Sequence, residues 1–154
     1  MNSNQDDKKV QQMPLQVDQH LCFALYSANL AMHKVYRQLL AELEITYPQY
    51  LVMLVLWNQD DVTVSEIGEQ LFLDSATLTP LLKRLEVAGL LRRQRSRRDE
   101  RQVVVTLTDE GHALRERAQS FPEAVRCATA CDDDTLIALK NQLDDLRANL
   151  IRAK

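Results

Sequence analysis

The sequence of 154 residues contains only three glycines, four prolines and three cysteines, and 5% of it is aromatic. So few glycines and prolines argue against an all-β fold, which needs many tight turns. An odd number of widely separated cysteines excludes a disulfide framework as the basis of the fold. No apolar run reaches the length of a membrane-spanning helix, and the start, MNSNQDDKKVQQMPLQ, lacks the apolar core of a signal peptide.

The remaining composition is typical of a globular domain, with 45% hydrophobic and 27% charged residues. A chain of this length can bury a core of its own, so we expect one subunit over residues 18–154. Residues 1–17 are predicted to form a disordered arm. The expected compartment is the cytoplasm, where the cysteines would be thiols at rest.

Apolar periodicity predicts a mainly α fold. The first two expected helices run from Asp18 to about Leu43 and from Pro48 to about Asn58. A third begins at Val64 or Ser65, and a fourth runs from Asp74 or Ser75 to a stop at Gly89. A fifth runs from Asp109 to about Ser120, with a restart or kink at Pro122, and the last runs from the cluster Asp132–Asp134 to about Arg152. In the second of these helices QYLVMLVLW is interpreted as buried throughout, and Ser65 with Glu66 nearby as an imperfect cap of the third. Two strands, Leu90–Arg93 and Gln102–Thr108, are predicted between the fourth and fifth helices.

The turn between these strands is rich in arginine. Six arginines fall within ten residues: Arg92, Arg93, Arg95, Arg97, Arg98 and Arg101. The segment from Lys83 to Arg101 carries a balance of +5 in a protein whose net charge is −3, which leaves −8 for the rest. A solvated charge run is the simplest alternative, but this run lies between two strands rather than in a tail. The asymmetry therefore indicates a surface that binds phosphates.

A helix, a short turn, a second helix and a β-hairpin together form a winged helix-turn-helix, expected over residues 48–108. The second helix turns Leu78, Leu81, Leu82 and Leu85 inward, while Pro80 on the opposite face should bend or loosen its start. Thr and Lys on that face can bond base edges in the major groove, and arginine at the hairpin tip can enter the minor groove. The candidate DNA-binding residues are Ser75, Ala76, Thr77, Thr79, Lys83, Arg84, Arg97, Arg98, Asp99 and Arg101.

The segment SEIGEQLFLDSATLTPLLKRLEVAGLLRR, followed by RRDERQVVVTLTDEG, resembles the multiple-antibiotic-resistance regulator (MarR) family of dimeric bacterial repressors. The resemblance implies that Asp99 positions the wing while Arg101 approaches the minor groove of a pseudo-palindromic promoter site. It also implies a homodimer built from residues 18–47 and 109–154. The leucine stripe Leu136, Leu139, Leu143, Leu146 and Leu150 suits such an interface.

Cys22 in the first helix has two interpretations. It is either a small buried hydrophobe or, about one turn inside a helix capped by Asp18, a thiol whose thiolate form the helix dipole favours. Tyr36 and Tyr47 could donate hydrogen bonds to such a thiolate. Tyr36 lies roughly 21 Å further along the same helix, at ~1.5 Å per residue, so the two could meet only across a two-fold axis.

The segments DQHLCFALY and ITYPQYLVMLVLW, together with Tyr36, resemble the organic hydroperoxide resistance regulator (OhrR) branch of that family. The resemblance implies that Cys22 senses organic hydroperoxides and that Tyr36 and Tyr47 of the partner subunit are its donors. Further cysteines, Cys127 and Cys131, indicate the two-cysteine type, in which a distal cysteine forms an intersubunit disulfide. Cys127 is preferred as the cysteine that forms this disulfide because it follows the fifth helix, although the spacing does not exclude Cys131.

Three other functions compete with this interpretation. A metal sensor or other ligand-responsive repressor could use His20, Cys22, His33, Cys127 and Cys131, but their spacing is loose and no metal or cofactor is expected. A thiol peroxidase would leave the arginine-rich wing without a purpose, so no enzyme is expected. A structural nucleoid protein would leave Cys22 unexplained.

Overall fold

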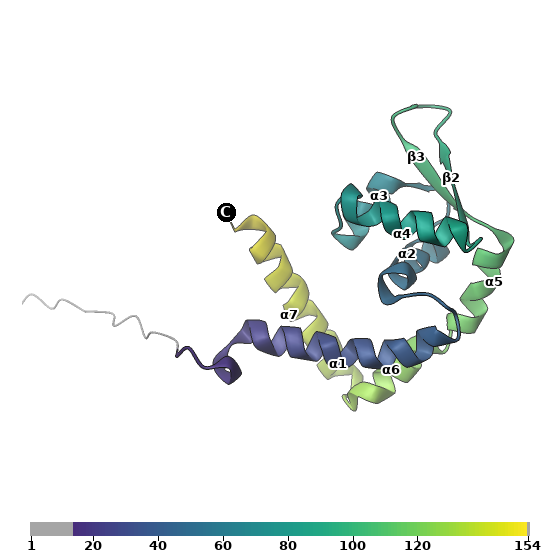
Figure 1. Cartoon of the computed structure of the whole chain (residues 1–154). Coiled ribbons are helices and arrows are strands. Elements are labelled where there is room, and N and C mark those ends of the chain that lie inside the picture. The colour runs from purple at the N-terminus through teal and green to yellow at the C-terminus, as the bar shows by residue number, and fades with distance from the viewer. Residues whose placement is uncertain (1–13, 154) are drawn as a thin grey trace, which may run out of the picture. The chain divides into compact units, whose positions relative to one another are not determined.

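The computed structural model describes residues 14–153. Its elements are a short 3-10 helix (Val17–Gln19), α1 (Leu21–Ala41), α2 (Tyr47–Asn58), β1 (Val62–Thr63), α3 (Val64–Leu71), α4 (Ser75–Val87), β2 (Leu91–Arg95), β3 (Val103–Leu107), α5 (Asp109–Ala118), α6 (Phe121–Thr129) and α7 (Asp133–Arg152) (Figure 1). The arm predicted over residues 1–17 lies, up to residue 13, outside the described residues. Among the helices described, none is long and apolar enough to cross a membrane.

The described part of the chain divides into two compact units, residues 14–34 and residues 35–153. The boundary falls within α1. The second unit contains the helix-turn-helix, the sheet and the C-terminal helices, and the prediction of a mainly α fold with a winged helix-turn-helix is confirmed.

The start of the first helix differs from the prediction. Asp18 lies in the 3-10 helix, and His20 after it is extended (φ −98°, ψ 127°), so α1 begins only at Leu21. The imidazole of His20 bonds the carbonyl oxygen of Pro14 at 3.1 Å. Asp18 therefore does not cap α1, and Cys22 is the second residue of that helix rather than a full turn inside it.

Local capping explains where α2 and α3 begin. Thr46 and Gln49 form a reciprocal capping box at α2, and Pro48 occupies the first turn as predicted. At α3 the box joins Thr63 and Glu66, so Ser65 is not the cap. The prediction that α2 is buried throughout is wrong at Leu54, which is 40% exposed because it points away from the core.

Helix α4 begins and ends as the sequence predicts. The side chain of Asp74 accepts a hydrogen bond from the Thr77 amide at 2.8 Å. At the other end Gly89 has a φ of 78°, and the Leu90 amide bonds the Leu85 carbonyl at 3.0 Å, a glycine-dependent stop. α7 is likewise capped by Asp132, as its acidic cluster predicts.

The sheet has three antiparallel strands in the order β1-β3-β2, where the sequence predicted two. In the missed pairing, Val62 lies opposite Val105 and Thr63 opposite Val104. β2 extends to Arg95, two residues beyond the prediction, opposite Val103. The core beneath the sheet is built from α2, α3 and α4, and Gly111 packs so closely on it that a Cβ would lie 2.1 Å from the Leu90 carbonyl oxygen.

The C-terminal helix is different, because none of the side chains of α7 is fully buried. Of its predicted leucine stripe, Leu139, Leu143 and Leu150 are exposed, whereas Leu136 and Leu146 are half-buried. Nearby Ile137 and Ile151 are also exposed. α7 therefore carries an apolar surface that its own subunit does not cover.

Candidate nucleic-acid interface and redox site

The two faces of α4 separate as predicted. Leu78, Leu81, Leu82 and Leu85 are buried. The candidate DNA-binding residues of this helix are all exposed: Ser75, Ala76, Thr77, Thr79, Lys83 and Arg84. Pro80 lies on the same exposed face without interrupting the helix, so the expected loosening does not break α4. The helix can therefore present a continuous polar edge to a DNA groove.

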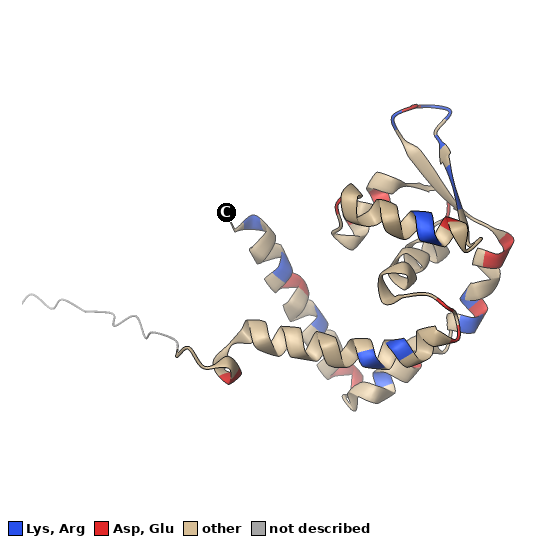
Figure 2. Cartoon of the chain, in the orientation of Figure 1, with Lys and Arg blue, Asp and Glu red and all other residues tan. Residues whose placement is uncertain are grey.

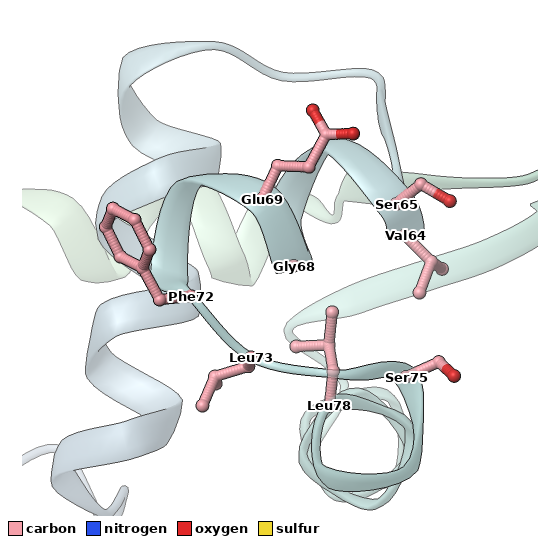
Figure 3. A pocket seen from close by; sticks show the side chains of 8 residues that line it. All are labelled: Val64, Ser65, Gly68, Glu69, Phe72, Leu73, Ser75 and Leu78. Atoms are coloured by element: carbon pink, nitrogen blue, oxygen red, sulfur yellow. The ribbon is translucent and has the colours of Figure 1, made fainter. Parts of the chain in front are cut away.

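A hollow of about 400 Å³ lies between α3 and the start of α4 (Figure 3). Ser65 and Ser75, near the N-terminal ends of the two helices, both line it. The helices approach closely there because residue 68 is glycine: a Cβ would lie 2.8 Å from the Leu73 carbonyl oxygen. Ser65 was absent from the predicted site; its hydroxyl is exposed because Thr63, and not Ser65, caps α3.

The wing is the hairpin β2–β3, and basic residues follow β2 and the turn after it (Figure 2). Hydrogen bonds order the tip: the Arg101 amide bonds Asp99 Oδ1 at 3.1 Å, and the Arg98 amide bonds Ser96 Oγ at 3.2 Å. Arg97, Arg98 and Arg101 are exposed, and within the described chain their guanidinium groups have no hydrogen-bond or ion-pair partner. Their charges are available for phosphates.

Arg93 has a different role from the arginines at the tip. Its amide and guanidinium both bond the carboxylate of Glu86 on α4, at 2.8 and 3.1 Å. The bond from the Arg93 amide is the main reason why the pKa of Glu86 is lowered. Arg93 therefore joins the base of the wing to α4.

The three cysteines are free thiols in different surroundings. Cys127 is exposed on α6 and its Sγ lies 3.5 Å from Glu123 Oε1, while the half-buried Cys131 donates to the Thr129 carbonyl at 3.3 Å. Cys22 is exposed at the start of α1, in a first turn without acidic residues. Among the described residues it is the one cysteine with no hydrogen-bond acceptor. The alternative that Cys22 is a buried hydrophobe does not fit this exposure within the subunit.

The two predicted donors lie together. The ring centroids of Tyr36 on α1 and Tyr47 on α2 are 4.7 Å apart, and both side chains are half-buried. Burial, followed by the nearby Tyr47 and Tyr50, raises the pKa of Tyr36 to about 12, and burial also raises the pKa of Tyr47. Both phenols therefore stay protonated at neutral pH and can donate hydrogen bonds.

Tyr50 is the residue of this cluster that the sequence did not single out. It is almost fully buried, and its ring lies 5.7 Å from Tyr36, 6.0 Å from Phe121 and 6.2 Å from Trp57. The Trp57 indole donates to the Gly111 carbonyl at 2.9 Å. Tyr50 thus connects the tyrosine pair to α6 through Phe121 and to α5 through Trp57. The described residues contain no group of three or more His, Cys, Asp or Glu side chains that could hold a metal.

Fold and exposed basic surface together define a winged-helix DNA-binding regulator of transcription. The family model of the SarA/Rot transcriptional regulators matches residues 34–117. The chain belongs to this MarR-like family, as the resemblance of its sequence predicted.

Two curated relatives are close in sequence. The chain is 50% identical over 137 residues to the HTH-type transcriptional regulator TtmR of Methylorubrum extorquens (strain PA1). This alignment covers 89% of this chain and 70% of that protein. It is 44% identical over 136 residues to the organic hydroperoxide resistance transcriptional regulator of Bacillus subtilis (strain 168). This alignment covers 88% of this chain and 92% of that protein. The predicted likeness to the hydroperoxide regulators is therefore confirmed.

Among solved structures, AbfR of Staphylococcus epidermidis is similar in several states. Reduced AbfR bound to DNA aligns with a TM-score of 0.72 at 36% identity, over 86% of this chain and 93% of that one. The disulfide form of AbfR aligns with a lower TM-score of 0.58 at 37% identity, over 82% of this chain and 88% of that one.

Proposed function

We propose that the protein is a peroxide-sensing repressor that binds promoter DNA when Cys22 is reduced and releases it when organic hydroperoxides oxidise Cys22 and a disulfide forms with Cys127 of the partner subunit. The observation that carries the proposal is the pair of protonated phenols, Tyr36 and Tyr47, whose ring centroids are 4.7 Å apart, together with an exposed Cys22 whose thiol has no hydrogen-bond acceptor among the described residues. Donors of this kind stabilise a thiolate and the oxyanion that leaves a hydroperoxide. The 44% identity to a hydroperoxide resistance regulator supports the proposal.

The chemistry proceeds in two steps. The Cys22 thiolate attacks the hydroperoxide ROOH, whose O–O bond breaks; the sulfur takes OH as a sulfenic acid, and RO⁻ takes a proton to leave as the alcohol. The thiol of Cys127 of the partner subunit then attacks this sulfur. The S–O bond breaks, a disulfide forms, and the thiol proton leaves with the hydroxyl as water. Sulfur is oxidised and the peroxide is reduced by two electrons.

DNA binding is assigned to the exposed edge of α4 and to the tip of the wing. In this proposal Thr79 and Lys83 contact bases, Ser75, Ala76, Thr77 and Arg84 line the groove, and Arg97, Arg98 and Arg101 contact phosphates and the minor groove, with Asp99 ordering the tip. Two subunits would read a pseudo-palindromic operator in the cytoplasm. The protein would be a regulator rather than an enzyme, as the names of its relatives indicate.

The homodimer is proposed from the uncovered apolar surface of α7 and from the exposed residues of α1, including Leu21 and Phe23. It would also bring Cys22 to the tyrosine pair of the partner subunit. Release would follow from the disulfide rather than from oxidation of the sensor alone. An over-oxidised form of AbfR bound to DNA has been crystallised, which supports this order of events.

The experiment is DNA retention on one promoter fragment, with and without an organic hydroperoxide, beside a titration with Zn²⁺ and other divalent metals. The proposal expects release by hydroperoxide, reversal by dithiothreitol and no response to metals. Release by a metal, with hydroperoxide inert, would contradict it and favour a metal-responsive repressor.

A further inference from the structure

Phe72 ends α3 in a backbone conformation that aromatic residues rarely adopt. Its φ of 56° and ψ of 37° lie in the left-handed region, where helices usually place a glycine or an asparagine. A bulky side chain in this conformation is strained. The residue is also 57% exposed, so burial does not offset that strain. The aromatic ring at this position therefore needs another explanation.

The ring faces a cation from the C-terminal helix. Cζ of Arg147 on α7 lies 4.2 Å from the centroid of the Phe72 ring, well inside the ~6 Å range of a cation–π interaction. The Arg147 guanidinium forms a salt bridge with Asp144 Oδ1 at 3.1 Å, and Asp144 Oδ2 forms another with Lys140 Nζ at 2.6 Å. The guanidinium is therefore fixed on its own helix as it covers the ring.

Phe72 lies at the junction that fixes the start of the recognition helix. The Leu73 amide bonds the Gly68 carbonyl at 3.0 Å, and the next residue, Asp74, is the cap of α4. Figure 3 shows Phe72 and Leu73 in this short connection between α3 and α4. Only Leu73 and Asp74 separate Phe72 from α4. A displacement of the Phe72 ring would therefore move the first turn of α4.

None of the side chains of α7 is fully buried, although Asp144 and Leu146, close to Arg147, are half-buried. Within the part of the chain that the structure describes, Arg147 on Phe72 is the only ring, hydrogen-bond or ion-pair contact between α7 and the α3–α4 pair. We propose that Arg147 and Phe72 form a positioning pair through which α7 sets the orientation of α4 and so the affinity for a specific DNA site. The proposal depends on DNA binding and not on the peroxide mechanism.

The test compares variants on a duplex that the reduced wild-type protein has selected from a random pool. Phe72→Asn should weaken binding about two- to fivefold, the size of an exposed cation–π contact. The thermal unfolding midpoint should not fall, because asparagine tolerates the left-handed conformation. Arg147→Met should give the same loss, Arg147→Lys should retain most of the affinity, and the double variant should be no weaker than either single one.

Two controls separate positioning from other effects. Arg152→Met removes one positive charge from the same helix, where Arg152 bonds only α7 groups such as Asn149 at 2.7 Å, and should leave affinity unchanged. Trifluorophenylalanine at position 72 keeps the ring but removes its negative potential, and should weaken binding like Phe72→Asn. Wild-type affinity in the trifluorophenylalanine protein, or an equal loss in Arg152→Met, would overturn the proposal. The proposal would also be overturned if the Phe72 and Arg147 variants lost the same affinity for a duplex of unselected sequence.

Discussion

The rings of Tyr36 and Tyr47 lie 4.7 Å apart although they belong to different helices, α1 and α2. The α1–α2 connection turns at Glu44, which has a φ of 56°, and the buried Tyr50 packs behind the pair. Two phenolic donors are thus fixed in advance, so little entropy would be lost on binding the anionic sulfur that we propose for this site.

The first prediction concerns these donors. Tyr36→Phe and Tyr47→Phe should each slow formation of the Cys22 sulfenic acid about tenfold, because a hydrogen bond to a charged group contributes roughly 1.5–3 kcal/mol. Stopped-flow measurement with cumene hydroperoxide gives the rates. Tyr26→Phe is the matched control, since Tyr26 lies exposed on α1 outside the cluster. Wild-type rates in both Tyr36→Phe and Tyr47→Phe would remove the pair from the mechanism.

The second prediction concerns the wing. Alanine at Arg97, Arg98 or Arg101 should weaken DNA binding, because each side chain neutralises a phosphate when it binds. The slope of log K against log salt should fall by about one unit for each phosphate that is no longer neutralised. Arg93→Ala is the contrasting variant, because Arg93 pairs with Glu86; it should reduce stability more than the salt slope. Unchanged slopes in the three tip variants would exclude the wing from DNA binding.

The third prediction concerns the dimer. The wild-type protein should sediment as a homodimer, and Leu143→Glu on the uncovered surface of α7 should shift it towards monomer and weaken DNA binding. Asp145→Lys, a charge change elsewhere on α7, is the control and should remain dimeric. A stable wild-type monomer that binds the operator fully would contradict the dimer.

The sequence predicted most where the chemistry is local. Asp74, Gly89 and Asp132 marked helix ends correctly, because capping depends on residues within one turn. β1 was missed because it has only two residues and gains its identity from Val104 and Val105, far along the chain. The start of α1 was misplaced because Asp18 lies inside a 3-10 helix, Val17–Gln19, and the extended His20 separates that helix from α1.

The candidate site shows the same division. The exposed face of α4 followed from helical periodicity, and the polar edge is where it was expected. Tyr36 and Tyr47 were singled out as donors, but their contact with each other was not predicted, and neither Tyr50 nor the Arg147–Phe72 pair was singled out. These contacts join separate helices, and no spacing rule along one sequence reveals them. The roles of the individual site residues stay predictions until they are measured.

The fourth prediction concerns the second cysteine. After hydroperoxide treatment, Cys127→Ser should form no covalent dimer and should accumulate sulfinic acid at Cys22, whereas Cys131→Ser should form the dimer normally. Cys127 is exposed on α6, while Cys131 is half-buried and bonded within its own turn, so the former can reach a partner subunit with less rearrangement. A non-reducing gel with peptide mass spectrometry identifies the bond. A covalent dimer that persists in Cys127→Ser and disappears in Cys131→Ser would reverse the assignment.

The most direct test of the central claim is the DNA affinity of Cys22→Ser during a hydroperoxide titration. Fluorescence anisotropy of a labelled operator duplex should show that the reduced wild-type protein and Cys22→Ser bind equally well, because Cys22 lies outside the helix-turn-helix and wing. Low concentrations of cumene hydroperoxide should then release the wild-type protein, while Cys22→Ser stays bound. If Cys22→Ser leaves the duplex at the same hydroperoxide concentration as the wild-type protein, Cys22 is not the sensor and the account is wrong.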